Sequence, residues 1–384
     1  MRKLAIIGIG QTKIDEHWDK SLKELAGEAV FAALADAGRA TVDALFTGNM
    51  MSTSLNHQSN LGTQIADWVG INPTEAIKLE AACASGAAAL RAGMMAVASG
   101  EIDSAVVVGV EKMTDQHPKR TTYALATAAD ADWEGEQGLS FVAINALIMK
   151  RYMHEYGWTR EDFAPFSINA HANAMHNPFA RLHMPVDAKK HARARLVAEP
   201  ISILDASAIG DGAAAAIIVP AEHVPANGRP RISITGSGAA TDTISVHDRK
   251  DALWLNAAYL SSQRAYQMAA LTPSDIDVFE LHDAFSIMAA LSLEATGFAE
   301  RGKGPRLGLE GQITPTGRIP ITTMGGLKAR GHPVGATGMY QIAELVQQLR
   351  GEAGKTQVDG AKIGMAQNIG GSGASIITTI LQAN

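Results

Sequence analysis

The chain has 384 residues, of which 46% are hydrophobic, and its formal net charge at pH 7 is −6. This length predicts two or three structural units, and the acidic balance excludes a protein that binds nucleic acid through bulk charge. A single cysteine excludes an intrachain disulfide and a cysteine-based zinc site, so we expect a reducing, cytoplasmic environment. No run of about 18 apolar residues occurs, and we expect no membrane span.

The first part of the chain alternates predicted strands and helices. Short apolar runs bounded by turn residues predict strands at 4–9, 42–49, 76–79 and 102–110. Apolar residues at helical spacing predict helices at 21–37, 62–70 and 87–99. Such alternation is typical of an α/β protein with a layered, mostly parallel sheet.

Residues 114–197 differ in composition from the first part of the chain. The alternation of strand and helix patterns weakens there, and aromatic residues and histidines are more frequent. We interpret this segment as a large insertion. Its later part is locally basic, with Arg181, His183, Lys189, Lys190, His191, Arg193 and Arg195. A solvated helix face explains this run most simply, and a binding surface for a polyanionic ligand is the alternative. The histidine spacings fit no zinc motif.

The second half repeats the pattern of the first. A strand followed by Gly-x-Gly at 231–238 resembles the one at 4–10, and the strand at 361–368 resembles the one at 102–110. We therefore divide the chain into a first half at 1–113, the insertion at 114–197, a completion of the first half at 198–230 and a second half at 231–384. Such halves, each with a sheet edge of its own, are expected to pack face to face around a shared site.

Cys83, the only cysteine, lies between the predicted strand at 76–79 and the helix at 87–99. A cysteine at the start of a helix is near free backbone N–H groups and the positive end of the helix dipole, which favour the thiolate. A buried structural cysteine is the alternative reading of this residue taken alone.

Three further loops carry chemistry, namely 282–285 (His-Asp-Ala-Phe), 331–333 (Gly-His-Pro) and 368–373, which is rich in glycine. A cysteine nucleophile needs a base, usually a histidine, and glycine-rich turns supply backbone N–H donors to an oxyanion. Neither Gly-x-Gly turn completes a dinucleotide fingerprint, and no P-loop is present, so we expect no nucleotide cofactor.

Together these motifs resemble the thiolase family, most closely its sterol-carrier-protein-2-type and archaeal branch. The resemblance covers essentially the whole chain and includes further segments at 109–113, 211–215 and 325–338. It implies an α/β, five-layer αβαβα fold made of two repeated halves with an inserted loop domain. It also implies coenzyme A thioesters as substrates, without a resident cofactor or metal, and a homodimer or homotetramer.

The resemblance also implies roles for individual residues. Cys83 would take the acyl group and His332 would activate its thiol and help bind the thioester oxygen. His282 would hold an oxyanion-hole water, and the N–H groups of Cys83 and Gly370 would form the other oxyanion hole. The coenzyme A phosphates would contact the basic part of the insertion, with Arg181, Lys189, Lys190, Arg193 and Arg195 as candidates.

One departure from the family pattern concerns Asn368. Many thiolases have a second cysteine at this position, which moves the α-proton during carbon–carbon bond formation. Some members of the branch carry it in the loop at 282–285 instead, but this chain has Ala284 there. Acyl transfer to Cys83 does not need the second cysteine. The proton-transfer step needs another group, and His332 and His282 are the candidates.

The resulting prediction is an acetyl-CoA C-acetyltransferase that makes and cleaves acetoacetyl-CoA through an acyl-cysteine. One alternative enzyme would pass the acyl group to an acceptor other than coenzyme A. Another alternative is a subunit in a complex with a small OB-fold protein or with hydroxymethylglutaryl-CoA synthase. A fatty-acid-type ketosynthase, with one cysteine and two histidines, is less compatible with the sequences around His282 and His332.

Overall fold

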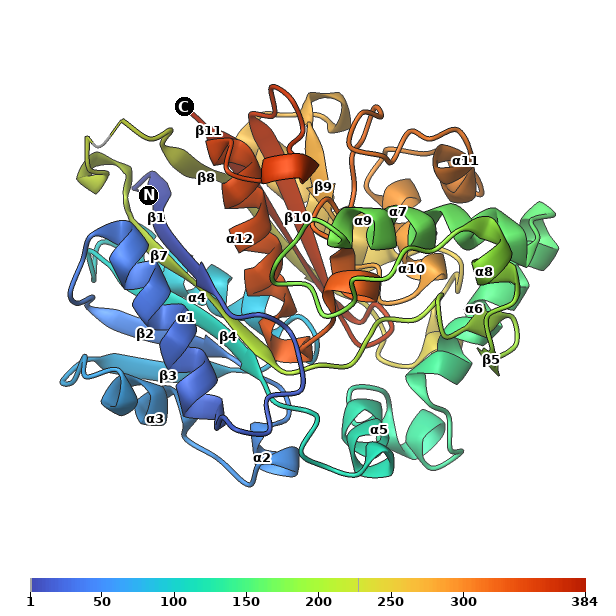
Figure 1. The fold of residues 1–384 in the computed structure, drawn as a ribbon, viewed down its shortest axis with the longest axis horizontal. Coiled ribbons are helices and arrows are strands. Elements are labelled where there is room, and N and C mark those ends of the chain that lie inside the picture. The colour runs from blue at the N-terminus through green and yellow to red at the C-terminus, as the bar shows by residue number, and fades with distance from the viewer. Residues whose placement is uncertain (1, 227) are drawn as a thin grey trace.

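The structure is a computed structural model that describes residues 2–226 and 228–384, and it is built on one nine-stranded mixed sheet (Figure 1). From edge to edge the strands are β3 (Glu75–Leu79), β2 (Ala44–Gly48), β4 (Ala105–Glu111), β7 (Gly212–Pro220), β1 (Leu4–Gln11), β8 (Ile232–Thr241), β11 (Ser375–Ala383), β10 (Ile363–Gly370) and β9 (Val278–Glu280). A separate pair is formed by β5 (Leu196–Ala198) and β6 (Ile201–Ser202).

The helices of the first half follow the predicted pattern. They are α1 (Leu22–Ala37), α2 (Ser52–Leu55), α3 (Leu61–Trp68) and α4 (Ser85–Ser99). Helix α1 begins where Ser21 and Glu24 form a capping box and ends at Gly38, whose left-handed backbone allows the C-terminal N–H groups to find acceptors. The sequence signals thus place α1, α3 and α4 to within one or two residues, whereas the short helix α2 was not predicted.

The prediction that the second half repeats the first is confirmed by the strand pairing. In the first half β2 pairs parallel with β4, which pairs antiparallel with β7, which pairs antiparallel with β1. In the second half β9, β10, β11 and β8 pair in the same order and the same directions. The counterpart of β3 is reduced to an isolated bridge between Phe279 and Ile321.

Helices form three layers around the two halves of the sheet. Helix α4 and its counterpart α12 (Thr337–Arg350) pack against each other and against strands of both halves. Helices α1 and α3 cover the outer face of the first half, whereas α9 (Asn256–Ala269) covers that of the second and contacts α10 (Ser286–Ala295). Figure 1 shows α12 in the middle of the molecule, between the blue first half and the orange second half. This is the expected five-layer arrangement.

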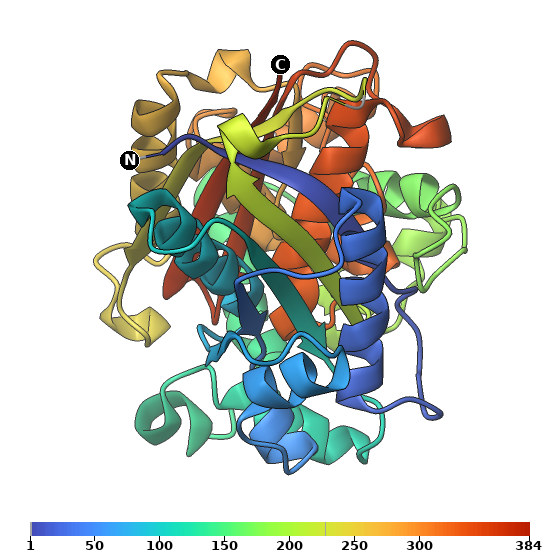
Figure 2. The same cartoon turned by 90° about the vertical axis from the view of Figure 1, so that its left-hand side faces the viewer.

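The two halves are not separate sheets, which corrects the expectation that each has a sheet edge of its own. Leu4, Ala5 and Ile6 of β1 pair with Ile234, Ser233 and Ile232 of β8, so the sheet continues from one half into the other. Pairing at this point satisfies backbone groups that two open edges would leave exposed. Figure 2 shows the blue β1 beside the olive β7, with the red strands of the second half behind them.

The insertion is helical, with α5 (Pro118–Ala126), α6 (Phe141–Tyr156), α7 (Ala164–Ala174) and α8 (Ala188–Ala192). Its buried side chains Tyr152, Phe163 and Phe166 belong to the same hydrophobic core as Phe279 and Ile287 of the second half. The insertion interrupts the first half in sequence, but its apolar side chains complete the core of the second half. A short helix of that half, α11 (Gly304–Leu309), also contacts α7 and α10.

Within the described residues, one helical stretch, Ala82–Ser99, is long and apolar enough to cross a membrane by length and composition alone. Most of this stretch is α4, and 61% of it is buried inside the fold. Core helices pass the same test. Because α4 packs against both halves of the sheet, we assign it to the core.

Candidate active site

A tight turn between β3 and α4 holds Cys83. Ala82 has a left-handed backbone (φ +52°), which is rare for a residue with a side chain and indicates local strain. The Ser85 hydroxyl fixes the turn, because it donates to the Ala82 carbonyl (2.6 Å) and accepts from the Ala81 N–H (2.9 Å). Cys83 is therefore held two residues before α4, and the residue as a whole is partly exposed.

His332 lies in the corresponding loop before α12. Its ring Nδ1 is 2.6 Å from the Thr337 hydroxyl, whose oxygen also lies 3.1 Å from the Pro333 carbonyl. A hydroxyl has one proton, and the carbonyl can only accept it. Thr337 therefore donates to Pro333 and accepts from Nδ1–H, which leaves Nε2 of the neutral His332 with a free lone pair.

Glycines allow the starts of α4 and α12 to touch. A Cβ atom added at Gly86 would lie 2.8 Å from the Gly335 carbonyl, and one added at Gly338 would lie 2.6 Å from the Ala87 nitrogen. Both distances are shorter than real Cβ contacts, so larger residues would push the two helices apart. This close approach is what brings Cys83 and His332, from different halves, to one place.

His282 follows β9, and Asn368 lies near the end of the neighbouring β10. Asn368 Nδ2 is 3.1 Å from His282 Nδ1, and both side chains are buried. The rings of His282 and His332 are 5.1 Å apart between centroids and stand almost perpendicular, at 86°. The two histidines are thus direct neighbours.

These residues surround a cavity of about 80 Å³. It is lined by Cys83, Leu125, Phe141, Asn145, Ser207, His282, Ala284, Phe285, Met288, His332, Ile369 and Gly371. The structure therefore brings the predicted cysteine and both predicted histidines together at one cavity.

The role of Gly370 as a backbone donor to an oxyanion stays a prediction. The N–H groups that are directed at the Cys83 sulfur belong to Gly371 and to Cys83 itself, so Gly371 is a further candidate donor. Gly370 is the last residue of β10 and is paired with Ser375 of β11, so the turn itself begins one residue later. Gly371, whose backbone is left-handed (φ +62°), lines the Cys83 cavity.

The electrostatics differ from the expectation of a thiolate stabilised by the helix dipole. Burial, followed by the nearby Glu111 carboxylate, raises the pKa of Cys83 to about 12. Burial lowers the pKa of His282 to about 3, and burial together with His282 and Arg330 holds the pKa of His332 well below its usual range. At neutral pH the site contains a neutral thiol and two neutral imidazoles, so desolvation outweighs the helix-start effect.

Glu111 is a buried carboxylate for which the sequence analysis predicted no role, although it lies in the motif at 109–113. Its oxygens accept N–H groups from Met50, Met51 and Gly335, and the Asn49 amide also donates to it. Burial raises its pKa to about 7. Glu111 ties the loop that carries His332 to the end of β2.

Lys328 performs a similar function for the loop that carries His282. Its buried ammonium donates to the carbonyls of Asp205 (2.7 Å) and Asp283 (3.1 Å). Burial lowers the pKa of Lys328 to about 8. This lysine therefore joins the segment after the insertion to the His282 loop.

Four of the five predicted coenzyme A contacts lie together. Lys189, Lys190, Arg193 and Arg195 line a surface cavity of about 560 Å³ that has one acidic lining residue, Asp187. Arg181 lies elsewhere, beside the loop of His332, where its guanidinium pairs with Asp15 and Glu16. The structure thus separates Arg181 from the other four.

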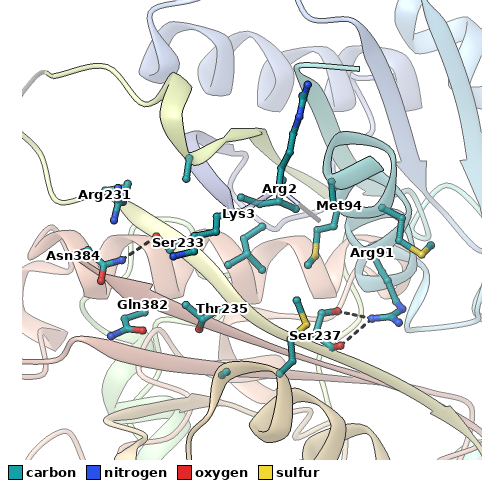
Figure 3. A pocket seen from close by; sticks show the side chains of 17 residues that line it. Arg2, Lys3, Arg91, Met94, Arg231, Ser233, Thr235, Ser237, Gln382 and Asn384 are labelled. Carbon is teal, nitrogen blue, oxygen red and sulfur yellow. Dashed lines mark hydrogen bonds between the residues drawn. The ribbon is translucent and has the colours of Figure 1, made fainter. Parts of the chain in front are cut away.

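Another cavity, of about 650 Å³, lies at the far end of α4 from Cys83 (Figure 3). Met94 of α4 and Arg2, Lys3 and Arg231 line it, and Arg91 donates there to the carbonyl and hydroxyl of Ser237. None of the predicted catalytic residues borders this cavity.

Over residues 2–226 and 228–384, no group of three or more His, Cys, Asp or Glu side chains is arranged to hold a metal ion.

A duplicated α/β fold with a cysteine and two histidines at the junction of its halves defines the class of the thiolase-like enzymes. The family model of the thiolase N-terminal domain matches residues 4–222, and that of the thiolase C-terminal domain-like region matches residues 238–383. The chain belongs to the thiolase family.

Individual relatives agree with this assignment. An acetyl-CoA acetyltransferase from Methanothermobacter thermautotrophicus is 46% identical over 377 residues, which cover 98% of each chain. Human sterol carrier protein 2 is 31% identical over 395 residues, covering 98% of this chain and 72% of the relative. Among solved structures, an "Ltp2-ChsH2(DUF35) aldolase" is similar with a TM-score of 0.84, 28% identity and coverage of 99% and 98% of the two chains.

Proposed function

We propose that this protein is an acetyl-CoA C-acetyltransferase that forms and cleaves acetoacetyl-CoA through an acyl-Cys83 intermediate. The observation that carries the proposal is the cavity that Cys83 and His332 line together, with a free lone pair on His332 Nε2. The similarity to the enzyme from Methanothermobacter thermautotrophicus, over nearly the full length of both chains, supports the same reaction.

In the first half-reaction, His332 Nε2 takes the proton of the Cys83 thiol as the sulfur attacks the thioester carbonyl. The new carbon–sulfur bond forms, the bond to coenzyme A breaks, and the imidazolium returns the proton to the leaving thiolate. Because the free site holds a neutral thiol and a neutral imidazole, this transfer is coupled to attack. The N–H groups of Gly371 and Cys83, both directed at the sulfur, are candidate donors for the developing oxyanion.

We propose that the basic cavity holds the phosphates of coenzyme A. Its lining includes Ile203 and Leu204, and Ser207 lines the Cys83 cavity only a few residues further along the chain. Four peptide units span at most about 14 Å. The two cavities are therefore close enough for a flexible arm to reach from one to the other, with the phosphates paired to Lys189, Lys190, Arg193 and Arg195.

The size of the Cys83 cavity favours a short acyl group. About 80 Å³ equals the liquid volume of roughly two or three water molecules, and the apolar lining residues Leu125, Phe141 and Met288 close it. An acetyl group fits this space, whereas a long acyl chain needs the lining to move. The same fit disfavours a bulky acceptor other than coenzyme A.

We further propose a homo-oligomer in a reducing, cytoplasmic environment, with coenzyme A thioesters as substrates and no resident cofactor. Strand β3 supports association, because it is the edge of the sheet and its Ile77 is 44% exposed. The solved aldolase with a DUF35 partner supports a complex with such a protein as a second possibility. A purely structural subunit is not favoured, because the cysteine–histidine site is complete.

The experiment that tests the proposal is a turnover assay with purified protein. Acetyl-CoA alone should yield acetoacetyl-CoA and free coenzyme A, and acetoacetyl-CoA plus coenzyme A should yield acetyl-CoA. Both reactions should be absent from the Cys83→Ala variant. Turnover that persists in this variant, or a wild-type protein inactive in both directions, contradicts the proposed function.

A further inference from the structure

Asn368 occupies the position at which other thiolases have their second cysteine, and its contact fixes the protonation of His282. The amide nitrogen of Asn368 lies 3.1 Å from His282 Nδ1, and an amide NH₂ group can only donate. Nδ1 is therefore the acceptor. Burial keeps His282 neutral at physiological pH, so its single proton is on Nε2. Within the described residues Nε2–H has no hydrogen-bond acceptor, and the ring lines the cavity.

His332 has the opposite arrangement. Its proton is on Nδ1, directed at Thr337, and its Nε2 is an acceptor. The adjacent rings, 5.1 Å apart, thus present one hydrogen-bond donor and one base to the same cavity. Of the two histidines, only His332 presents an unprotonated ring nitrogen to the cavity, because the acceptor nitrogen of His282 is bonded to Asn368.

The amide oxygen of Asn368, Oδ1, does not share in these contacts. Asn368 Oδ1 is buried and has no hydrogen-bond partner among residues 2–226 and 228–384. It packs against Gly338, where an added Cβ atom would lie only 2.4 Å away. An unpaired buried oxygen costs stability, and Asn145 Oδ1 is unpaired as well, so the contact of Asn368 with His282 carries the inference.

We propose that Asn368 is a positioning residue for condensation: it fixes the proton of His282 on Nε2, so that His282 donates to the thioester oxygen of the second acetyl-CoA and His332 is the base. This inference rests on the proposed function. His332 Nε2 removes the α-proton, and the enolate carbon attacks the acyl carbon on Cys83. The carbon–carbon bond forms, the bond to Cys83 breaks, and its thiolate recovers the proton from His332. No second cysteine is required.

The direct test is nitrogen NMR of the protein labelled with ¹⁵N-histidine, because the two tautomers have different ring-nitrogen shifts. The His282 signals are assigned by their loss in the His282→Gln variant. In the wild type at pH 7 they should be those of an Nε2–H tautomer. In Asn368→Asp, a carboxylate that only accepts should move the proton to Nδ1. A wild-type His282 that is protonated on Nδ1, or on both nitrogens, overturns the inference.

Half-reaction kinetics give a second readout. Asn368→Asp should slow condensation by about 10²–10³-fold, the loss typical of one oxyanion donor, while the release of coenzyme A on acylation stays within about threefold. Equal losses in both steps, or no loss, would mean that Asn368 has a packing role only. Asn145→Asp is the matched control, because it makes the same substitution at a residue that lines the Cys83 cavity and bonds to the Phe141 carbonyl instead of a histidine, and it should leave the His282 tautomer unchanged. A wild type that makes no acetoacetyl-CoA would contradict the proposed function, whereas the tautomer would still decide the role of Asn368.

Discussion

The hydroxyl of Thr337 determines whether His332 can act as a base, and its removal should slow acylation. Thr337→Val keeps the shape of the side chain but removes the acceptor that lies 2.6 Å from His332 Nδ1. A buried N–H left without an acceptor costs about 1–3 kcal/mol. At about 1.4 kcal/mol per factor of ten, this corresponds to a loss of about 5- to 150-fold in the rate of acyl-enzyme formation.

The assay is a rapid-quench measurement of coenzyme A released on mixing enzyme with excess acetyl-CoA. Thr337→Ser retains the hydroxyl and should acylate within a few-fold of the wild type. Thermal unfolding of both variants shows whether the start of α12 remains intact, since the hydroxyl also bonds to the Pro333 carbonyl. A Thr337→Val variant that is folded and acylates at the wild-type rate would refute the assigned tautomer of His332.

Three further predictions follow from other parts of the site. Alkylation of Cys83 by iodoacetamide should be slow at pH 7 and should still be accelerating at pH 10, because burial raises its pKa to about 12. Replacing Arg193 and Arg195 by alanine should raise the KM for acetyl-CoA by about 2- to 30-fold with a smaller change in kcat, as expected for two partly exposed ion pairs. Glu111→Gln should lower the free energy of unfolding by about 1–3 kcal/mol, because its amide group would face the N–H groups that Glu111 now accepts, and urea titration measures this loss.

A specific result would contradict each of these three predictions. A plateau of the alkylation rate near pH 7 would mean a thiolate, as the position before α4 alone suggests. Arg151→Ala is the control, since Arg151 is an exposed residue of α6 that pairs with Glu155. An unchanged KM in the double variant, or an equal rise of KM in Arg151→Ala, would mean that the basic residues form only a solvated helix face. A Glu111→Gln variant of wild-type stability would mean that the loop of His332 is held by other contacts.

The sequence predicted the parts of this protein that depend on local patterns. The helix that begins at Ser21 has a capping box and a glycine stop, and the lone cysteine lies between a predicted strand and a predicted helix, so both could be located from neighbouring residues. The convergence of Cys83, His282 and His332 was expected from their motifs. Spacing alone could not have shown it, because these residues meet only after the halves dock.

Other features depend on long-range contacts and could not be predicted. Residues of β1 pair with residues of β8 more than 200 positions later, and the insertion completes a hydrophobic core of the half that follows it. The thiol was expected to be acidic because the helix start is visible in the sequence, whereas the burial that reverses the shift is not. The bond from Asn368 to His282 likewise joins β10 to the loop after β9, and it gives a function to the residue that replaces the second cysteine.

The central claim is that Cys83 carries the acyl group. Intact-mass measurement after brief mixing with acetyl-CoA, followed by peptide mapping, tests it most directly. The account predicts a single acetyl adduct on the peptide that contains Cys83, its removal by added coenzyme A, and its absence from Cys83→Ala. An adduct on another residue, or a wild-type enzyme that turns over without any covalent adduct, would contradict the account.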